Sequence, residues 1–241
     1  MTTDLQGKRV VVIGGTSGIG FATAEAAARD GATVVVASSS ADRVDHAVAR
    51  LPTGTTGHVV DVSREDHIRG FFERVGAFDH LVYTAGETLH LEPLATTDLD
   101  AARQFWNIRF WGAFVAAKLG SPRINPGGSI VLSSGIASLR PQSGWTVCSS
   151  LCGAMESLTR ALAVELAPIR VNAVAPGFVR TPLWGNIAEA DREAMFSQAS
   201  AALPVGRVGE PADIALTYLY LMREGFSTGQ VIVVDGGAVL V

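Results

Sequence analysis

Short apolar runs rich in β-branched residues alternate with longer segments of helical periodicity along the whole chain. Such runs are typical of strands that are buried on both faces of a parallel sheet. They predict strands over residues 10–13, 33–37, 57–60, 80–84, 129–133, 169–174 and 230–234. The segments between them predict helices over residues 21–30, 40–50, 65–75, 98–119, 147–166 and 210–223. This order indicates an α/β fold, a doubly wound parallel sheet of the Rossmann type in a single domain spanning residues 1–241.

The expected topology also predicts where a ligand binds. Parallel strands are joined by right-handed crossovers, and the sheet reverses its direction of growth after the first strand. Ligands of such sheets bind at this reversal, beyond the carboxyl ends of the strands. We therefore expect a crevice formed by the loops that follow residues 13, 37, 60, 84, 133 and 174.

A glycine-rich turn with the spacing G-x-x-x-G-x-G joins the first predicted strand to the first helix. Glycine permits a tight turn that a Cβ atom would block, a close approach of the backbone to a pyrophosphate, and close packing of helix on strand. The free N–H groups and the positive dipole end of the helix then face the phosphates. The candidate cofactor-binding residues of this turn are Gly14, Thr16, Ser17, Gly18, Ile19 and Gly20.

Composition and charge exclude several classes of partner. The chain has a net charge of −4 and no cluster of basic residues that offsets it, so we expect no nucleic acid partner. No apolar stretch approaches the roughly 20 residues that span a bilayer, and the N-terminus lacks the pattern of a signal peptide. The sequence therefore predicts a cytoplasmic protein with no membrane partner. No histidine lies at a zinc spacing from the two cysteines, and we expect no bound metal.

Further landmarks follow the glycine turn, at the ends of predicted strands and within the helices. They are Asp61, Thr84-Ala85-Gly86, Asn107, Ser133-Ser134, Asn172, Pro176-Gly177, Thr181 and Val234-Asp235-Gly236-Gly237. In this order they resemble the short-chain dehydrogenase/reductase family from about residue 5 to residue 237. The resemblance implies a nicotinamide cofactor, a small-molecule substrate and a homo-oligomer, either a tetramer or a dimer.

The same resemblance implies which residues border each part of the cofactor. It implies Asp61 and Val62 beside the adenine, and Ala85 and Gly86, which follow Thr84, on the ribose side. Beside the nicotinamide it implies Pro176, Gly177, Val179 and Thr181.

The end of the second predicted strand bears on the choice between NAD(H) and NADP(H). NAD-selective turns of this kind carry an acidic residue there, which accepts hydrogen bonds from the ribose hydroxyls. This chain has Ser38, Ser39 and Ser40 instead, with no carboxylate to repel a 2′-phosphate. The prediction is NADP(H) over NAD(H), with Arg43 as a substitute for the arginine that the resemblance implies at this turn. The serines equally fit a structural role as caps of the next helix.

The resemblance implies a tyrosine and a lysine, four residues apart, on the helix of residues 147–166. Cys148 and Cys152 occupy these positions. The family's tyrosine transfers the alcohol proton, and the lysine lowers its pKa. Ser134 corresponds to the family's serine only if the loop has one extra residue, because Gly135 has the expected spacing. Asn107 corresponds to an asparagine that holds a water in the family.

Several interpretations of these replacements stay open. The two cysteines pack one helix face at i, i+4, or Cys148 is a catalytic thiol with a lowered pKa, or the pair has redox or metal chemistry. The leading hypothesis is an oxidoreductase with an atypical proton donor, which is Ser134, bound water or the substrate itself, while Cys148 and Cys152 replace the tyrosine and lysine. The alternatives are a non-redox cofactor-binding or scaffold protein, and a non-redox enzyme such as an isomerase or a cyclase.

The segment of residues 178–205 corresponds to the family's mobile substrate lid. Large apolar residues in and near this segment indicate an apolar or aromatic substrate; they are Trp145, Phe178, Leu183, Trp184, Met195 and Phe196. The same residues equally fit a purely structural role in packing. His90 is the one histidine that we expect near the crevice. Trp106, Phe110 and Trp111 flank Asn107 on a helix that, by resemblance, pairs with its copy in a homotetramer.

Overall fold

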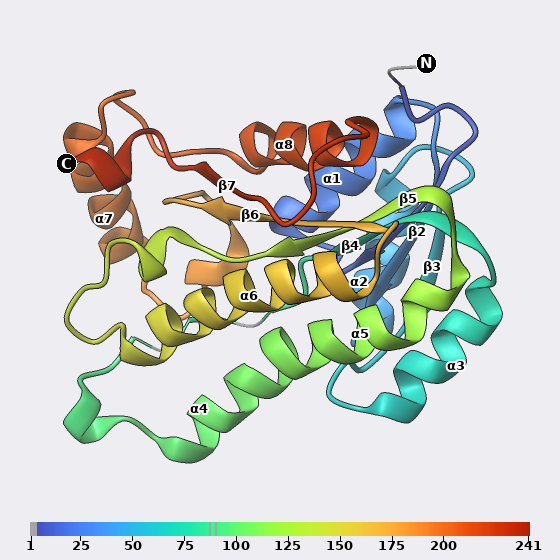
Figure 1. Ribbon diagram of the computed structural model, residues 1–241. Coiled ribbons are helices and arrows are strands. Elements are labelled where there is room, and N and C mark those ends of the chain that lie inside the picture. The colour runs from blue at the N-terminus through green and yellow to red at the C-terminus, as the bar shows by residue number, and fades with distance from the viewer. Residues whose placement is uncertain (1–3, 87, 90) are drawn as a thin grey trace.

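Within the described residues, seven parallel strands form one sheet in the order β3-β2-β1-β4-β5-β6-β7 (Figure 1). The computed structural model describes residues 4–86, 88–89 and 91–241, so the prediction for His90 lies outside the described residues. The strands are β1 (Arg9–Ile13), β2 (Thr33–Ser38), β3 (Thr56–Val59), β4 (Phe78–Tyr83), β5 (Ile124–Ser133), β6 (Arg170–Pro176) and β7 (Val231–Val234). The order reverses after β1, and this confirms the predicted doubly wound sheet.

Helices cover both faces of the sheet (Figure 1). One face carries α1 (Gly18–Arg29), α2 (Ala41–Arg50) and α8 (Pro211–Arg223), and the other carries α3 (Glu65–Val75), α5 (Gly112–Gly120) and α6 (Thr146–Glu165). Within β1, Val10 and Val12 belong to the core between the sheet and helices α1, α2 and α8. Val11 and Ile13 belong to the core between the sheet and helices α3, α5 and α6. Successive side chains of a strand point to opposite faces, so each apolar run serves both cores.

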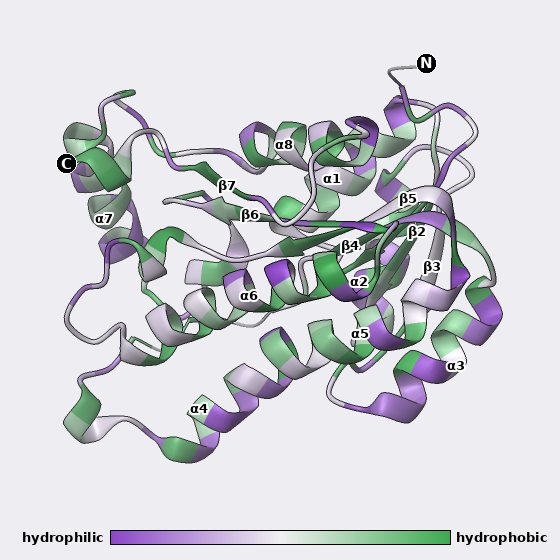
Figure 2. Ribbon diagram, in the orientation of Figure 1, coloured by the Kyte–Doolittle hydropathy of each residue, from purple (hydrophilic) through white to green (hydrophobic). Residues whose placement is uncertain are grey.

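The hydropathy of the residues follows this layering (Figure 2). The central strands are hydrophobic, and the hydrophilic residues lie on the outer surfaces of helices such as α3. Among the described residues, no helix combines the length and the apolar character that crossing a lipid bilayer requires.

The predicted helix over residues 98–119 is interrupted in the structure. It consists of α4 (Leu99–Trp106), a π-helical turn (Asn107–Trp111) and α5. Within the π-turn the N–H of Gly112 donates to the carbonyl of Asn107, five residues back. The carbonyl of Ile108 accepts a hydrogen bond from the Tyr83 hydroxyl at 2.5 Å. The glycine at position 112 leaves room for the Tyr83 hydroxyl beside this π-helical turn, because a Cβ atom on Gly112 would lie 2.2 Å from that hydroxyl oxygen.

A helix that the apolar pattern does not predict, α7 (Glu189–Ala202), lies within the segment of residues 178–205. Phe196 is its one buried residue among those described. A helix that buries so little has no apolar stripe from which it can be recognised.

Candidate active site

A cleft of about 590 Å³ opens beyond the carboxyl ends of the central strands, where the loops were expected to converge. All of the predicted cofactor-binding and catalytic residues line it except Ser40 and Asn107. Those that line it are Gly14, Thr16, Ser17, Gly18, Ile19, Gly20, Ser38, Ser39, Asp61, Val62, Thr84, Ala85, Gly86, Ser134, Cys148, Cys152, Pro176, Gly177, Val179 and Thr181. Residues far apart in the sequence are thus brought to one site.

The glycine turn forms one end of the cleft, and two of its glycines, Gly14 and Gly20, have no room for a Cβ atom. Gly14 has a φ of 89°, and a Cβ atom there would lie 2.4 Å from the backbone nitrogen of Ala85. A Cβ atom on Gly20 would lie 2.2 Å from the carbonyl oxygen of Gly14. Helix α1 starts at Gly18, and its N-cap, Ser17, makes no side-chain hydrogen bond to the first turn. The N–H groups of this turn have no intrahelical acceptors and fit a pyrophosphate.

The end of β2 presents a cation and a hydroxyl to the cleft. Arg43 and Ser39 both line it, and Nη2 of Arg43 donates to Oγ of Ser39 at 3.2 Å. Ser40 lies outside the lining and caps α2, since its Oγ accepts from the backbone nitrogen of Arg43 at 3.4 Å. The predicted role as a helix cap therefore applies to Ser40, whereas Ser39 lines the cleft.

The Asp61 carboxylate lies at the adenine side of the predicted site. Its Oδ1 accepts hydrogen bonds from the hydroxyl of Ser63 at 2.7 Å and from the backbone nitrogen of Ser63 at 2.9 Å. The hydrogen bond from the hydroxyl lowers the pKa of Asp61 below its ordinary value. Asp61 is therefore held as an anion by its own turn.

Two thiols on α6 line the middle of the cleft. Cys148 and Cys152 are 8% and 5% exposed. Hydrogen bonding between the two thiols lowers the pKa of Cys148 and raises the pKa of Cys152. The Ser134 hydroxyl donates to the backbone carbonyl of Cys152 at 3.1 Å. No group of three or more His, Cys, Asp or Glu residues that could hold a metal ion occurs in the described part of the chain.

Arg109, on the π-turn, is a cleft residue that the sequence analysis missed. Its guanidinium lies 4.6 Å from the ring centre of Phe105, and a Cβ atom on Gly86 would approach its Cζ to 2.5 Å. The positive charge of Arg109 adds to the lowering of the pKa of Cys148. A cation therefore lies near the thiols, although the chain has no lysine at this site.

The expected place of Asn107 in the site is corrected by the structure. Asn107 is exposed and borders a shallow groove on the outer side of α4. It lies two residues before Arg109, which corresponds to a rotation of about 200° around a helix. Arg109 instead continues the buried stripe of Phe105, Ala113 and Ala116. A charged residue on an otherwise apolar helical stripe is the sequence signal that identifies it.

Aromatic side chains form the substrate end of the cleft. Trp145, Phe178, Leu183 and Trp184 line it, and the rings of Phe178 and Trp184 stack at 5.6 Å. Met195 and Phe196, which were expected to share this role, are absent from the lining. Phe196 instead packs edge-on against Trp184 at 6.4 Å and supports it from α7.

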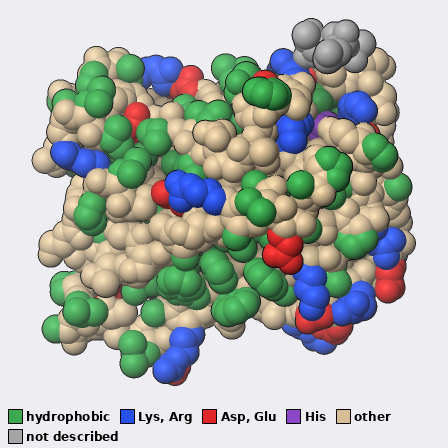
Figure 3. Space-filling view, in the orientation of Figure 1, with side chains coloured by type: hydrophobic (Ala, Val, Ile, Leu, Met, Phe, Trp, Pro, Cys, Tyr) green, Lys and Arg blue, Asp and Glu red, His purple; other side chains and the backbone are tan. Residues whose placement is uncertain are grey.

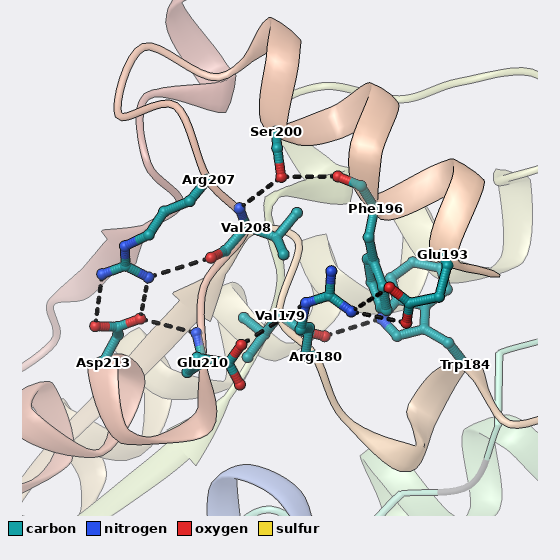
Figure 4. Close-up of polar contacts among 10 residues, drawn as sticks. All are labelled: Val179, Arg180, Trp184, Glu193, Phe196, Ser200, Arg207, Val208, Glu210 and Asp213. Atoms are coloured by element: carbon teal, nitrogen blue, oxygen red, sulfur yellow. Dashed lines mark hydrogen bonds and ion pairs between the residues drawn. The ribbon is translucent and has the colours of Figure 1, made fainter. Parts of the chain in front are cut away.

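Polar contacts connect the segment of residues 178–205 to the start of α8 (Figure 4). Nη1 of Arg180 contacts both carboxylate oxygens of Glu193 at 2.8 Å, and its Nε lies 3.7 Å from Glu210. Nε1 of Trp184 donates to the carbonyl of Val179 at 3.0 Å (Figure 4). Surface ion pairs contribute little each, about 0–1 kcal/mol, so these contacts orient the segment without locking it.

Comparison with known proteins gives consistent results. The family described as enoyl-(acyl carrier protein) reductase matches residues 14–239. The short-chain dehydrogenase/reductase ATR9 of Stachybotrys chlorohalonatus is 36% identical, with 98% of each chain covered. A solved small-chain dehydrogenase in complex with NADPH is 36% identical with a TM-score of 0.84, over 98% of this chain and 100% of that one. The structure of MalC reductase/Diels-Alderase from Malbranchea aurantiaca has a TM-score of 0.92 at 31% identity, over 99% of each chain.

Proposed function

Because the chain belongs to the short-chain dehydrogenase/reductase family, we propose that it is an NADP(H)-dependent oxidoreductase acting on the carbonyl or alcohol group of a small, mainly apolar substrate. The observation that carries this proposal is a continuous cleft that joins the glycine turn to the thiols of α6. When bound, a nicotinamide cofactor supplies or accepts a hydride. The protein must then seat the cofactor, hold the substrate and move a proton.

The residues that would hold the cofactor divide by chemistry. The glycine turn and the first turn of α1 fit the pyrophosphate, because they offer N–H groups and because Gly14 and Gly20 leave no space for a Cβ atom. Ser39 and Arg43 would hold a 2′-phosphate, since a guanidinium and a hydroxyl both donate to phosphate oxygens. These two residues support NADP(H) over NAD(H).

A fluorescence titration of the purified wild-type protein with NADPH and with NADH tests the cofactor. We expect NADPH to bind roughly tenfold more tightly or better, because a charge-assisted hydrogen bond contributes about 1.5–3 kcal/mol. Loss of NADPH absorbance with a panel of aromatic ketones then tests the redox reaction. Failure of both cofactors to bind would contradict the proposed function.

Replacement of Arg43 by alanine is expected to weaken NADPH binding roughly tenfold and to change NADH binding by less than about twofold. The reason is that the guanidinium interacts with the 2′-phosphate, which NADH lacks. Isothermal titration calorimetry with both cofactors measures the two effects. Arg50→Ala, on the same helix but outside the cleft lining, is the matched control. Equal losses for NADPH and NADH would show that Arg43 does not select the cofactor.

Two groups of the cleft would act on the substrate. The Arg109 guanidinium stabilises negative charge that develops on the substrate oxygen, since it is permanently charged and partly shielded from water. Cys148 carries the proton that this oxygen gains or loses, because its pKa is lowered and its side chain lines the cleft. Ser134, through the carbonyl of Cys152, positions the pair of thiols. The pair thus replaces the tyrosine and lysine expected from the family.

The aromatic end of the cleft supports an apolar substrate. Trp145 and Phe178 lie 6.2 Å apart between ring centres, and Trp184 stacks behind Phe178. We propose the segment of residues 178–205 as a substrate lid, because its first residues line the cleft while its helix α7 lies outside the lining. Ring faces of this kind bind flat apolar or aromatic molecules.

A second candidate function is cyclisation or isomerisation in the same cleft. The observation in its favour is that the chain has cysteines in place of tyrosine and lysine and shares its whole fold with the reductase/Diels-Alderase structure. Such a reaction would use the aromatic walls and Arg109 and would leave NADPH unconsumed. A product with the mass of its substrate, formed without loss of NADPH absorbance, would distinguish it.

We propose that copies of this chain associate through the surface formed by α4, α5 and α6. Hydrophobic side chains gather over these helices (Figure 3). Leu99, Trp111 and Phe114 are exposed, and the rings of Trp111 and Phe114 meet edge to face at 5.8 Å. Large exposed aromatic residues on one helical surface are typical of an interface between subunits. A homotetramer or a homodimer accounts for them.

The substitution Trp111→Glu is expected to reduce the mass of the assembly by half or more, because a carboxylate would be buried there without a partner. Size-exclusion chromatography with light scattering measures the mass against the 25.2 kDa of one chain. Val59→Glu is the matched control, since Val59 is 51% exposed, as Trp111 is at 52%, but lies on the edge strand β3. A wild-type protein that elutes as a monomer would contradict the proposed association.

A further inference from the structure

Arg180 belongs by its backbone to the part of the chain that forms the cleft. Val179, the residue before it, is buried and lines the cleft. The backbone nitrogen of Arg180 donates to the carbonyl of Gly209 at 2.9 Å, and the nitrogen of Gly209 donates to the carbonyl of Phe178 at 2.9 Å. These two hydrogen bonds tie the segment to a residue that lies two positions before α8. The side chain of Arg180 therefore starts from a fixed backbone.

The side chain of Arg180 reaches from this backbone to helix α7 (Figure 4). Its Nη1 donates to both carboxylate oxygens of Glu193 at 2.8 Å, and its Cζ lies 4.5 Å from the ring centre of Phe196. Its Nε lies 3.7 Å from a carboxylate oxygen of Glu210. A guanidinium that contacts a carboxylate and a ring face at once holds its partners more firmly than a single exposed ion pair does. Arg180 thus joins the fixed segment to α7.

The ring of Phe196 connects this contact to the wall of the cleft. Phe196 is 2% exposed and packs edge-on against Trp184 at 6.4 Å. Trp184 stacks on Phe178 at 5.6 Å, and its Nε1 donates to the carbonyl of Val179 at 3.0 Å. Trp184 and Phe178 line the cleft, whereas Arg180 and Phe196 lie outside the lining. A continuous series of contacts therefore runs from the guanidinium to the aromatic wall.

A different residue holds the opposite end of α7. Oγ of Ser200, in the last turn, accepts from the backbone nitrogen of Val208 at 3.1 Å and donates to the carbonyl of Phe196 at 2.8 Å. Glu193 lies in the first half of the helix. Without Arg180, the like charges of Glu193 and Glu210 would lose the cation that contacts both. The first half of α7 would then loosen while its last turn stays attached, and Trp184 would lose support.

We propose that Arg180 is a positioning residue that makes the cleft select substrates with a flat aromatic ring over small aliphatic ones, because it holds Phe196 against Trp184. The inference rests on the proposed function, since it concerns the substrate of the same cleft. A flat ring gains contact area from a rigid, stacked wall, whereas a small aliphatic ketone covers too little of the wall to depend on its position. Because Arg180 lies outside the cleft lining, its loss should act on KM more than on kcat.

Steady-state kinetics of Arg180→Gln with 2-acetonaphthone and with butanone test the proposal. For 2-acetonaphthone, KM is expected to rise roughly fivefold to tenfold while kcat stays within about twofold of the wild type. For butanone, both constants are expected to stay within about twofold. Arg207→Gln is the matched control, because Arg207 pairs with Asp213 of α8 at 2.6 Å rather than with α7 (Figure 4). A folded Arg180→Gln with the wild-type preference, or with equal losses for both ketones, would overturn the proposal.

Binding without turnover distinguishes a failure of this proposal from a failure of the proposed function. Equilibrium dialysis of the cofactor-free protein against 2-acetonaphthone measures Kd, which is expected to be roughly fivefold to tenfold higher for Arg180→Gln than for the wild type. If neither ketone is reduced, the proposed function fails, and the ratio of the two Kd values still decides the role of Arg180. A wild-type protein that does not bind 2-acetonaphthone would overturn the proposal.

Two further variants test whether Arg180 acts through α7. Arg180→Lys keeps the charge beside Glu193 and is expected to recover part of the preference for 2-acetonaphthone. Glu193→Gln is expected to raise the same KM, and its combination with Arg180→Gln should cost less than the sum of the two single effects. Thermal melting establishes that each variant is folded. Fully additive effects of the two substitutions would refute the coupling between Arg180 and α7.

Discussion

Replacement of Gly20 by alanine is expected to weaken NADPH binding roughly 100-fold or more and to destabilise the fold. The added Cβ atom would lie 2.2 Å from the carbonyl oxygen of Gly14 and 2.3 Å from the hydroxyl oxygen of Thr84. Since the first of these is a backbone atom, the turn itself must shift. Overpacking of this kind costs about 3 kcal/mol or more. For a chain of this size the melting temperature would fall by roughly 6–12 °C.

Titration calorimetry and thermal unfolding measure the two effects of this substitution separately. Gly70→Ala is the matched control, because Gly70 lies within α3 and its added Cβ atom would meet only the far end of the Arg74 side chain, at 3.3 Å. Alanine in a helix interior is better than glycine by about 1 kcal/mol, so the control should be as stable as the wild type or more stable. Gly20→Ala with an NADPH affinity within threefold of the wild type would disprove the assignment of the glycine turn.

Replacement of Arg109 by glutamine is expected to lower kcat/KM for ketone reduction roughly 100- to 1000-fold, which is the usual effect of weakening the stabilisation of a developing oxyanion. Glutamine keeps a hydrogen-bond donor but not the charge. The loss should appear in kcat more than in KM, because the charge on the substrate oxygen is largest in the transition state. Steady-state kinetics with the best ketone substrate of the wild-type protein provide the measurement.

The control for this substitution is Arg103→Gln on the neighbouring helix α4. Arg103 pairs with Asp100 at 2.7 Å on an exposed surface, so its loss should leave kcat/KM unchanged within about twofold. Arg109→Lys restores the charge without the planar donor set and is expected to be intermediate. Arg109→Gln with wild-type kcat and an unchanged pH profile would exclude Arg109 from the reaction.

Much of the fold could be predicted because its signals are local. The apolar runs identify all seven strands of the described sheet, and the N-cap serine before α2 lies where the sequence places it. The positions at which the strands begin and end depend on contacts that are less local. Strand β5 begins at Ile124 rather than at residue 129, because Phe78 of β4 pairs with Ile124 across a register shift. Pairing partners of this kind are not adjacent in sequence, so periodicity does not reveal them.

The catalytic part of the site shows where prediction from residues fails. Sequence spacing assigns Asn107, whereas the cleft contains Arg109. The π-turn that separates the two positions depends on Tyr83, which donates to the Ile108 carbonyl from another strand. The thiols show the same limit, because their opposite pKa shifts arise from hydrogen bonding between them, from burial and from Arg109.

The sequence by itself determined the doubly wound sheet, the glycine turn and the absence of the expected tyrosine and lysine. These follow from residue type and short-range spacing, since strand propensity, the lack of a Cβ atom and the identity of a side chain need no distant partner. Tertiary structure alone decided which cation enters the cleft, that both thiols line it, and that Phe196 supports the aromatic wall from outside. Each of these depends on a contact between segments far apart in the chain, because electrostatics and packing act through space rather than along the sequence.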